Sequence, residues 1–243
     1  MRPGRYQIFV GCALLNLALA ESRVQAQGTE VTANVVVQDK SAAGKHKSNP
    51  SSADVVVWLI PLKSDGRPAA TGHPGPFRLV QKDKMFIPHL SVVPTGSSVD
   101  FPNQDPFFHN VFSLFNGKRF DLGLYESGTS RAVHFDREGV SYIFCNIHPE
   151  MSAVVLALST PYFAIAGQDE SLLLDNIPAG DYEIHVWIEG LTQPDLDRLV
   201  RHVHLSSGGS QSISLDARDL SRQPASHLNK FGQSYEQPPK PAY

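Results

Sequence analysis

Short hydrophobic runs alternate with polar and turn-forming segments along most of the chain. The run 54–62 contains the sequence VVVWLI, whose β-branched and aromatic side chains favour a strand. Residues 78–158 show no helical periodicity of useful length. Many short strands with turns at close spacing predict an all-β fold built as a β-sandwich. We expect strands at 31–37, 54–62, 78–81, 85–87, 90–93, 98–103, 109–114, 131–135, 139–144 and 152–158.

A second β unit is predicted after Pro161. The turn 176–182 leads into a strand that alternates through Ile184, Val186 and Ile188. The segment 217–243 is polar and rich in Pro and Gln, so we expect a flexible tail there. The predicted division is 27–158 for the first unit (core 78–157, N-terminal strands 31–62) and 159–216 for the second. Which unit the strands in 31–62 pair with stays open, and further strands are expected at 162–166, 171–175, 182–189, 199–205 and 211–215.

The first 26 residues have the features of a secretory signal peptide. Arg2 and Arg5 precede an apolar run over 8–20 that is too short to span a bilayer. Small residues make Ala26 the favoured cleavage position, with Ala20 the second candidate. The sequence therefore predicts export to the periplasm, and the absence of a second long apolar run predicts no stable membrane insertion.

Cleavage would change both the charge and the cysteine count. The formal charge moves from −3 to −5, because Arg2, Arg5 and Arg23 leave together with Glu21. This balance argues against nucleic acid as a partner. One of the two cysteines also leaves with the segment, so Cys145 stands alone and cannot form an internal disulfide.

The segment 144–151 holds the strongest candidate chemistry. Cys145, His148 and Met151 lie within one loop, and His109 lies about one hairpin upstream. Each residue alone is more often structural than ligating. Together one Cys, two His and one weak Met form the ligand set of a blue-copper electron-transfer site. The sequence therefore predicts one type 1 copper per chain.

These residues resemble the cupredoxin family, and the Cys-x-x-His-Pro-x-Met loop is most similar to that of amicyanin. Cys145, His148, Pro149 and Met151 match that loop, and 109–110 matches its upstream His-Asn pair. The likeness covers about residues 78–157 and implies a Greek-key cupredoxin β-sandwich. The whole chain also resembles larger periplasmic cupredoxins labelled methylamine utilisation proteins.

The resemblance further implies how the site works. Asn110 would tie the two ligand loops together by hydrogen bonds, and Pro149 would lie next to the ligands. His148 would lie at an exposed edge in an apolar patch, with Pro149, Phe107 and Phe108 as candidate members. Redox partner proteins would dock there and exchange single electrons. The turn 176–182 resembles that of carboxypeptidase regulatory-like domains, small β-sandwiches.

Other functions compete with that of an electron carrier. Copper delivery, storage or sensing is the main alternative, although the chain has only three Met. A reductase or oxidase with several coppers would need a His-Cys-His element, but Phe144 and Asn146 flank Cys145, so we expect no enzyme. The second unit could instead be a binding module, yet no aromatic platform for sugar is evident. Four further histidines have no convincing partner in sequence and are assigned structural roles: His89, His134, His202 and His204.

Overall fold

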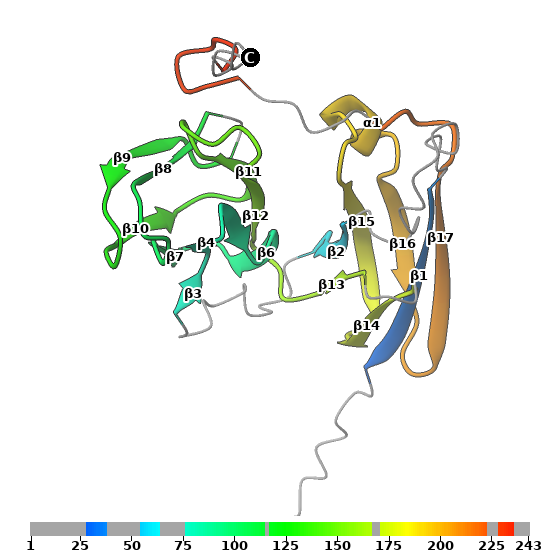
Figure 1. Cartoon of the computed structure of the whole chain (residues 1–243). Helices are drawn as coiled ribbons and strands as arrows, with labels where there is room; N and C mark the ends of the chain where they lie inside the picture. The colour runs from blue at the N-terminus through cyan, green and yellow to red at the C-terminus, as the bar shows by residue number, and fades with distance from the viewer. Residues whose placement is uncertain are drawn as a thin grey trace, which may run out of the picture.

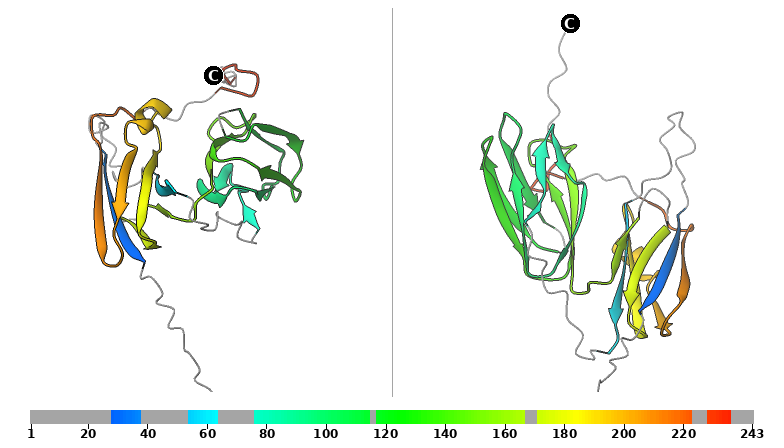
Figure 2. Two further views of the ribbon diagram at one scale, coloured as in Figure 1. Left: turned by 180° about the vertical axis from the view of Figure 1, so that it is seen from behind. Right: turned by 90° about the horizontal axis from the view of Figure 1, so that it is seen from below.

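The computed structural model describes residues 28–37, 54–63, 76–114, 117–166, 171–222 and 228–235. Two β-sandwiches lie side by side, and the chain passes between them after β12 (Figures 1 and 2). This confirms the predicted all-β fold. The predicted signal peptide and both cleavage positions lie outside the described residues. Among the described helices, none has the length and apolar character needed to cross a membrane.

The first sandwich contains a five-stranded sheet in the order β6-β12-β11-β8-β9 and a three-stranded sheet in the order β10-β7-β3. A small hairpin, β4-β5, adds to it. The strands are β3 (Phe77–Arg78), β4 (Val80–Lys82), β5 (Met85–Ile87), β6 (Leu90–Pro94), β7 (Ser97–Pro102), β8 (His109–Ser113), β9 (Phe120–Tyr125), β10 (Ser130–Phe135), β11 (Gly139–Phe144) and β12 (Ser152–Leu158).

The second sandwich pairs a four-stranded sheet, β13-β2-β15-β16, with a three-stranded sheet, β14-β1-β17. One short helix, α1, precedes β16. The elements are β1 (Thr29–Val37), β2 (Val55–Pro61), β13 (Phe163–Ile165), β14 (Ser171–Ile177), β15 (Gly180–Ile188), α1 (Gln193–Asp197), β16 (Arg201–Leu205) and β17 (Ser210–Ala217).

Both N-terminal strands belong to the second sandwich, not to the first unit at 27–158 as we expected. β1 pairs in parallel with β17 and antiparallel with β14, and β2 lies between β13 and β15. The reason is visible in β2, where Val55, Val56, Val57 and Leu59 are all buried. A strand buried on both faces needs a central place in a covered sheet. The chain therefore builds two strands of one unit before it enters the other.

Strand β12 joins the two hydrophobic cores. Ala153 and Val155 point into the first sandwich, whereas Val154, Leu156 and Leu158 pack in the core of the second. Because successive side chains of a strand point to opposite faces, one continuous apolar run serves both cores. The strand that follows the candidate metal loop is thus held from both sides.

Two elements lie where the sequence pattern gave no signal. β9 contains Gly123 in the left-handed region (φ 67°) and has only Tyr125 buried, so it lacks an apolar alternation. Helix α1 has five residues, which is too short to show a helical period.

Candidate metal centre

The candidate metal loop is a closed connection between two neighbouring strands. β11 and β12 are antiparallel, and their last pair before the loop is Phe144 with Ser152. Inside it, the Cys145 N–H donates to the Met151 carbonyl (3.3 Å) and the Met151 N–H donates to the His148 carbonyl (3.1 Å). His109 starts β8, which pairs with β11. The fold therefore brings both ligand segments to one end of the first sandwich.

Three of the four predicted ligands present their donor atoms to one point. Cys145 Sγ lies 3.7 Å from His109 Nδ1 and 3.5 Å from His148 Nδ1, and the two nitrogens are 3.2 Å apart. Cys145 and His109 are fully buried, while His148 is half-buried. A thiolate and two imidazole nitrogens arranged in this way can ligate a single metal ion, and the set suits copper. We refer to these three residues as the metal centre.

Met151 is buried in the same hydrophobic cluster as Cys145. Its position in the closed loop and its burial are compatible with a weak fourth ligand. The predicted role of its thioether stays a prediction.

Burial shifts the protonation equilibria of Cys145 and His148 in directions that have opposite effects on metal binding. Burial raises the pKa of Cys145, although backbone N–H groups of Asn110, Ile147 and His148 oppose that effect. Burial and the neighbouring His109 lower the pKa of His148. The thiolate is thus costly when no cation is near it, whereas the neutral imidazole of His148 is favoured. A metal ion would supply the missing positive charge and use the neutral imidazoles as ligands.

Asp105 supports the metal centre from behind, and the sequence analysis did not find it. Its Oδ2 accepts a 2.8 Å hydrogen bond from His109 Nε2. That bond fixes the tautomer and leaves the lone pair of Nδ1 directed at the centre. Burial alone would raise the pKa of Asp105, but N–H donors on Lys84, His109 and Asp83 hold it below its ordinary value. The available signal was an acidic residue four positions before His109.

An aromatic side chain covers the metal centre, and apolar side chains surround its exposed edge. The Phe107 ring lies 5.2 Å from the His109 ring and 5.6 Å from that of His148, measured between centroids. Phe108 is 55% exposed and Ile147 is 44% exposed. Pro149 is also exposed. The metal centre is therefore shielded on one side and open to an apolar surface near His148.

The side chain of Asn110 connects the two ligand segments indirectly. Its Nδ2 donates to Asp121 Oδ1 (2.7 Å), whose other oxygen accepts from Lys230 Nζ (2.7 Å). The backbone N–H of Lys230 then donates to Asn146 Oδ1 in the metal loop (2.9 Å). The backbone N–H of Asn110 also bonds the Cys145 thiol, so Asn110 does link the two ligand segments, and Asp121 and Lys230 add a second route.

The C-terminal segment 228–235 lies against the metal loop, unlike the flexible tail expected for 217–243 (Figure 1). Tyr235 donates from its hydroxyl to the Cys145 carbonyl (2.8 Å). Desolvation, followed by the charge of Cys145, raises the pKa of Tyr235 to about 12, so the hydroxyl keeps its proton at neutral pH. Hydrogen bonds that depend on the fold, rather than local composition, hold this segment.

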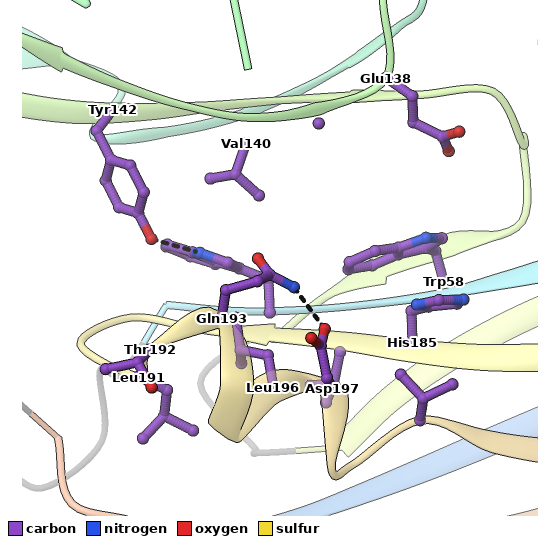
Figure 3. Close-up of a pocket in the computed structure, with 14 residues that line it drawn as sticks. Trp58, Glu138, Val140, Tyr142, His185, Leu191, Thr192, Gln193, Leu196 and Asp197 are labelled. Carbon is purple, nitrogen blue, oxygen red and sulfur yellow. Dashed lines mark hydrogen bonds between the residues drawn. The ribbon is translucent and has the colours of Figure 1, made fainter. Parts of the chain in front are cut away.

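A separate pocket of about 610 Å³ lies between the two sandwiches, away from the metal centre. Trp58 stacks on His185 at one part of it, with ring centroids 5.3 Å apart, and Trp187 Nε1 donates to the Tyr142 hydroxyl at another (3.3 Å; Figure 3). None of the four predicted copper ligands lines this pocket. Trp187 is fully buried, as befits a core residue.

Similar solved structures are copper proteins and cupredoxins. A Cu-containing nitrite reductase from Thermus scotoductus SA-01 is 22% identical (TM-score 0.34) over 42% of this chain and 28% of its own. A purple cupredoxin from Nitrosopumilus maritimus is 24% identical (TM-score 0.31) over 33% of this chain and 98% of its own. A reduced Cu(I) amicyanin variant is 16% identical (TM-score 0.32) over 41% of this chain and 97% of its own.

No family model matches the chain, and no curated protein matches it. The chain spans about a quarter of the nitrite reductase and leaves more than half of its own length outside each of these three matches.

Proposed function

We propose that this chain is a periplasmic cupredoxin that binds one type 1 copper and carries single electrons between redox partner proteins. The observation that supports this most directly is the convergence of Cys145 Sγ, His109 Nδ1 and His148 Nδ1 within 3.7 Å of one another in a largely buried setting. Export would be directed by residues 1–26.

His109, Cys145 and His148 would hold the copper strongly, with Met151 as a weak fourth ligand. Thiolate and thioether are soft donors, and imidazole is acceptable to both copper oxidation states. Bound copper would supply a one-electron redox couple. A buried setting and backbone N–H groups around the sulfur are among the features that tune such a couple.

The surrounding chain would keep the ligands in place while an electron arrives or leaves. One backbone hydrogen bond joins the two ends of the metal loop, from Cys145 to Met151, and Asp105 orients His109. Strand β12 is buried on both faces, so the loop starts and ends on rigid elements. Fast electron transfer requires that the ligands move little when the copper changes oxidation state, and these rigid elements would limit that movement.

His148 would be the point of electron exchange with a partner. It is the one half-buried member of the metal centre, and exposed Phe108, Ile147 and Pro149 lie close to it in sequence or space. An apolar patch around an exposed ligand edge suits brief docking of another protein. We propose no catalytic role for the chain.

The visible absorption spectrum after addition of Cu(II) tests the proposal. We expect an intense absorption in the red from the thiolate–copper pair, bleached by a reductant and lost in Cys145→Ser. His134→Gln is the matched control, because His134 is exposed on β10 and its Nδ1 lies 3.3 Å from the hydroxyl of Ser98, far in sequence from all four ligands. Copper bound without this band would favour copper delivery or storage instead, and no bound copper would overturn both.

A further inference from the structure

A second group of potential ligands lies at the boundary between the two sandwiches. Asp54 directly precedes β2 and Glu189 directly follows β15, both in the second sandwich, whereas His89 precedes β6 in the first. His89 Nε2 is 2.8 Å from Glu189 Oε1 and 3.8 Å from Asp54 Oδ2. One donor atom from each residue lies within 4.8 Å of the others. We call these three residues the boundary cluster.

The hydrogen bonding of His89 determines what the boundary cluster can hold. Its Nδ1 lies 3.0 Å from the Ser152 carbonyl, which can only accept, so Nδ1 carries a hydrogen. In the neutral imidazole, Nε2 then presents a lone pair to two carboxylates. Three electron-rich donors facing one another repel unless a cation lies between them, and that cation is either a proton on Nε2 or a metal ion.

We propose that the boundary cluster binds a divalent metal ion of the zinc class, with ligands from Asp54, His89 and Glu189. One imidazole and two carboxylates, with no thiolate, suit Zn²⁺ and similar divalent ions rather than Cu(I). A ligating imidazole ordinarily donates its other N–H to a carbonyl or carboxylate, as His89 does to Ser152. The three side chains are 25–39% exposed, so water can complete the coordination.

Protons compete with the metal ion for the boundary cluster. The hydrogen bond to Glu189 raises the pKa of His89, and burial raises that of Asp54. The hydrogen bond from His89 lowers the pKa of Glu189. Arg222, which donates from Nε to the Glu189 carbonyl (2.9 Å), adds a smaller lowering influence on both carboxyls, and the pKa of Asp54 still lies above its ordinary value. Both His89 and Asp54 must lose protons to ligate, so affinity for the metal ion falls as the pH falls.

A metal ion here would fasten the two sandwiches together. Its ligands come from both units, and Ser152, which orients His89, is the first residue of β12. This inference does not rest on the proposed electron-carrier function, because none of its ligands belongs to the metal centre.

Zinc titration by calorimetry, with metal analysis after gel filtration, tests the proposal. The full chain carries Cys145→Ser and His148→Ala, which remove two of the three donors of the metal centre. We expect this protein, here called the parent, to bind one zinc per chain. Adding His89→Gln or Glu189→Gln to it should reduce the affinity for zinc at least about tenfold. His204→Gln is the matched control, because His204 pairs with a single carboxylate, Asp181, at 2.7 Å and its loss should leave zinc binding unchanged.

Two results would overturn the proposal. One is a parent protein that binds no zinc; the other is equal affinity in the parent, His89→Gln and Glu189→Gln. Thermal unfolding of each variant without metal separates lost binding from lost folding. If His89→Gln fails to fold, Glu189→Gln, which keeps the size of the side chain, decides the outcome. Zinc should also raise the unfolding temperature of the parent but not that of the variants.

Discussion

The metal centre and the boundary cluster both place imidazole nitrogen beside anionic donors, but their surroundings differ. In the metal centre, Cys145 and His109 are fully buried and the donors include a soft sulfur. In the boundary cluster, all three side chains are partly exposed and the other donors are carboxylate oxygens. Burial and softness favour a retained redox metal, whereas partial exposure and oxygen donors favour an exchangeable divalent ion. The two proposed sites therefore have opposite chemical preferences.

The largest effect is expected when each site is disabled in turn, which tests whether the two sites bind metal independently. Cys145→Ser should abolish the visible copper band completely, whereas zinc should still bind to the boundary cluster. His89→Gln should keep the copper band but weaken zinc binding to the boundary cluster, because no donor is shared between the two sites. Absorption spectroscopy measures the band, and zinc calorimetry in protein whose metal centre is disabled by Cys145→Ser and His148→Ala measures the boundary cluster. Loss of both properties in either variant would mean that the sites are not independent.

A smaller effect is expected from Asp105→Asn. Removal of the carboxylate charge behind His109 withdraws an anionic partner that would stabilise the more positive Cu(II) state. We expect a higher reduction potential and copper affinity weaker by roughly 10- to 100-fold, as for other residues that support metal ligands. Voltammetry and copper competition titration measure these quantities. Asp197→Asn, on the remote helix α1, should change neither, and an unaltered potential in Asp105→Asn would show that the carboxylate charge does not tune the site.

When no metal is bound, the pKa shifts within the boundary cluster make the stability of the protein depend on pH. The hydrogen bond between His89 and Glu189 raises the pKa of His89 above 6.5 and lowers that of Glu189 below 4.5. The raised pKa of His89 contributes stability fully below pH 6.5, and this is lost as the pH rises through its folded value. The lowered pKa of Glu189 contributes stability above pH 4.5, and this is lost as the pH falls through its folded value.

Burial also raises the pKa of Asp54, so its contribution has the same sign as that of His89 and the opposite sign to that of Glu189: stability is lost as the pH rises from 3.8 through the folded value of Asp54. Urea unfolding of metal-free protein across a pH series measures the sum. His89→Gln should flatten the fall in the free energy of unfolding on the alkaline side, whereas His134→Gln should not. Parallel curves for parent and His89→Gln would contradict the pairing.

The difference between the two sites also explains which of them the sequence could reveal. Cys145, His148 and Met151 lie within seven residues, and strands on both sides close their loop, so local spacing was enough to suggest a ligand set. The boundary cluster draws its residues from 54, 89 and 189. Asp54 and Glu189 meet because β2 and β15 are neighbours in one sheet, and His89 reaches them from the first sandwich. Pairing of distant strands leaves no local pattern in the sequence.

The same reasoning applies to the fold. Runs with clear apolar character predicted most strands, including β11 and β12 around the metal loop. The partner of β2 could not be predicted, because a strand that is apolar on both faces fits the centre of any covered sheet. The contact of Lys230 and Tyr235 with the metal loop was also hidden, since a few side-chain hydrogen bonds hold a segment of otherwise polar composition.

The smallest expected effect comes from Tyr235→Phe, which removes the hydroxyl that donates to the Cys145 carbonyl. The carbonyl is part of the metal loop, but it can accept a hydrogen bond from water once the hydroxyl of the half-buried Tyr235 is gone. We expect the free energy of unfolding to fall by about 0.5–1.5 kcal/mol, the usual net value of one hydrogen bond. The copper band should stay in place, because the ligands themselves are untouched.

Segment 228–235 is the place to measure this effect directly. Limited proteolysis should cut the C-terminal segment faster in Tyr235→Phe than in the parent, and faster still when Lys230→Ala also removes the ion pair with Asp121 (2.7 Å). Lys63→Ala is the matched control, because its ion pair with Asp181 (4.0 Å) lies in the second sandwich. Equal cleavage rates in all four proteins would mean that these bonds do not hold the segment on the metal loop. The loop would then depend on its own backbone hydrogen bonds and on the two buried faces of β12.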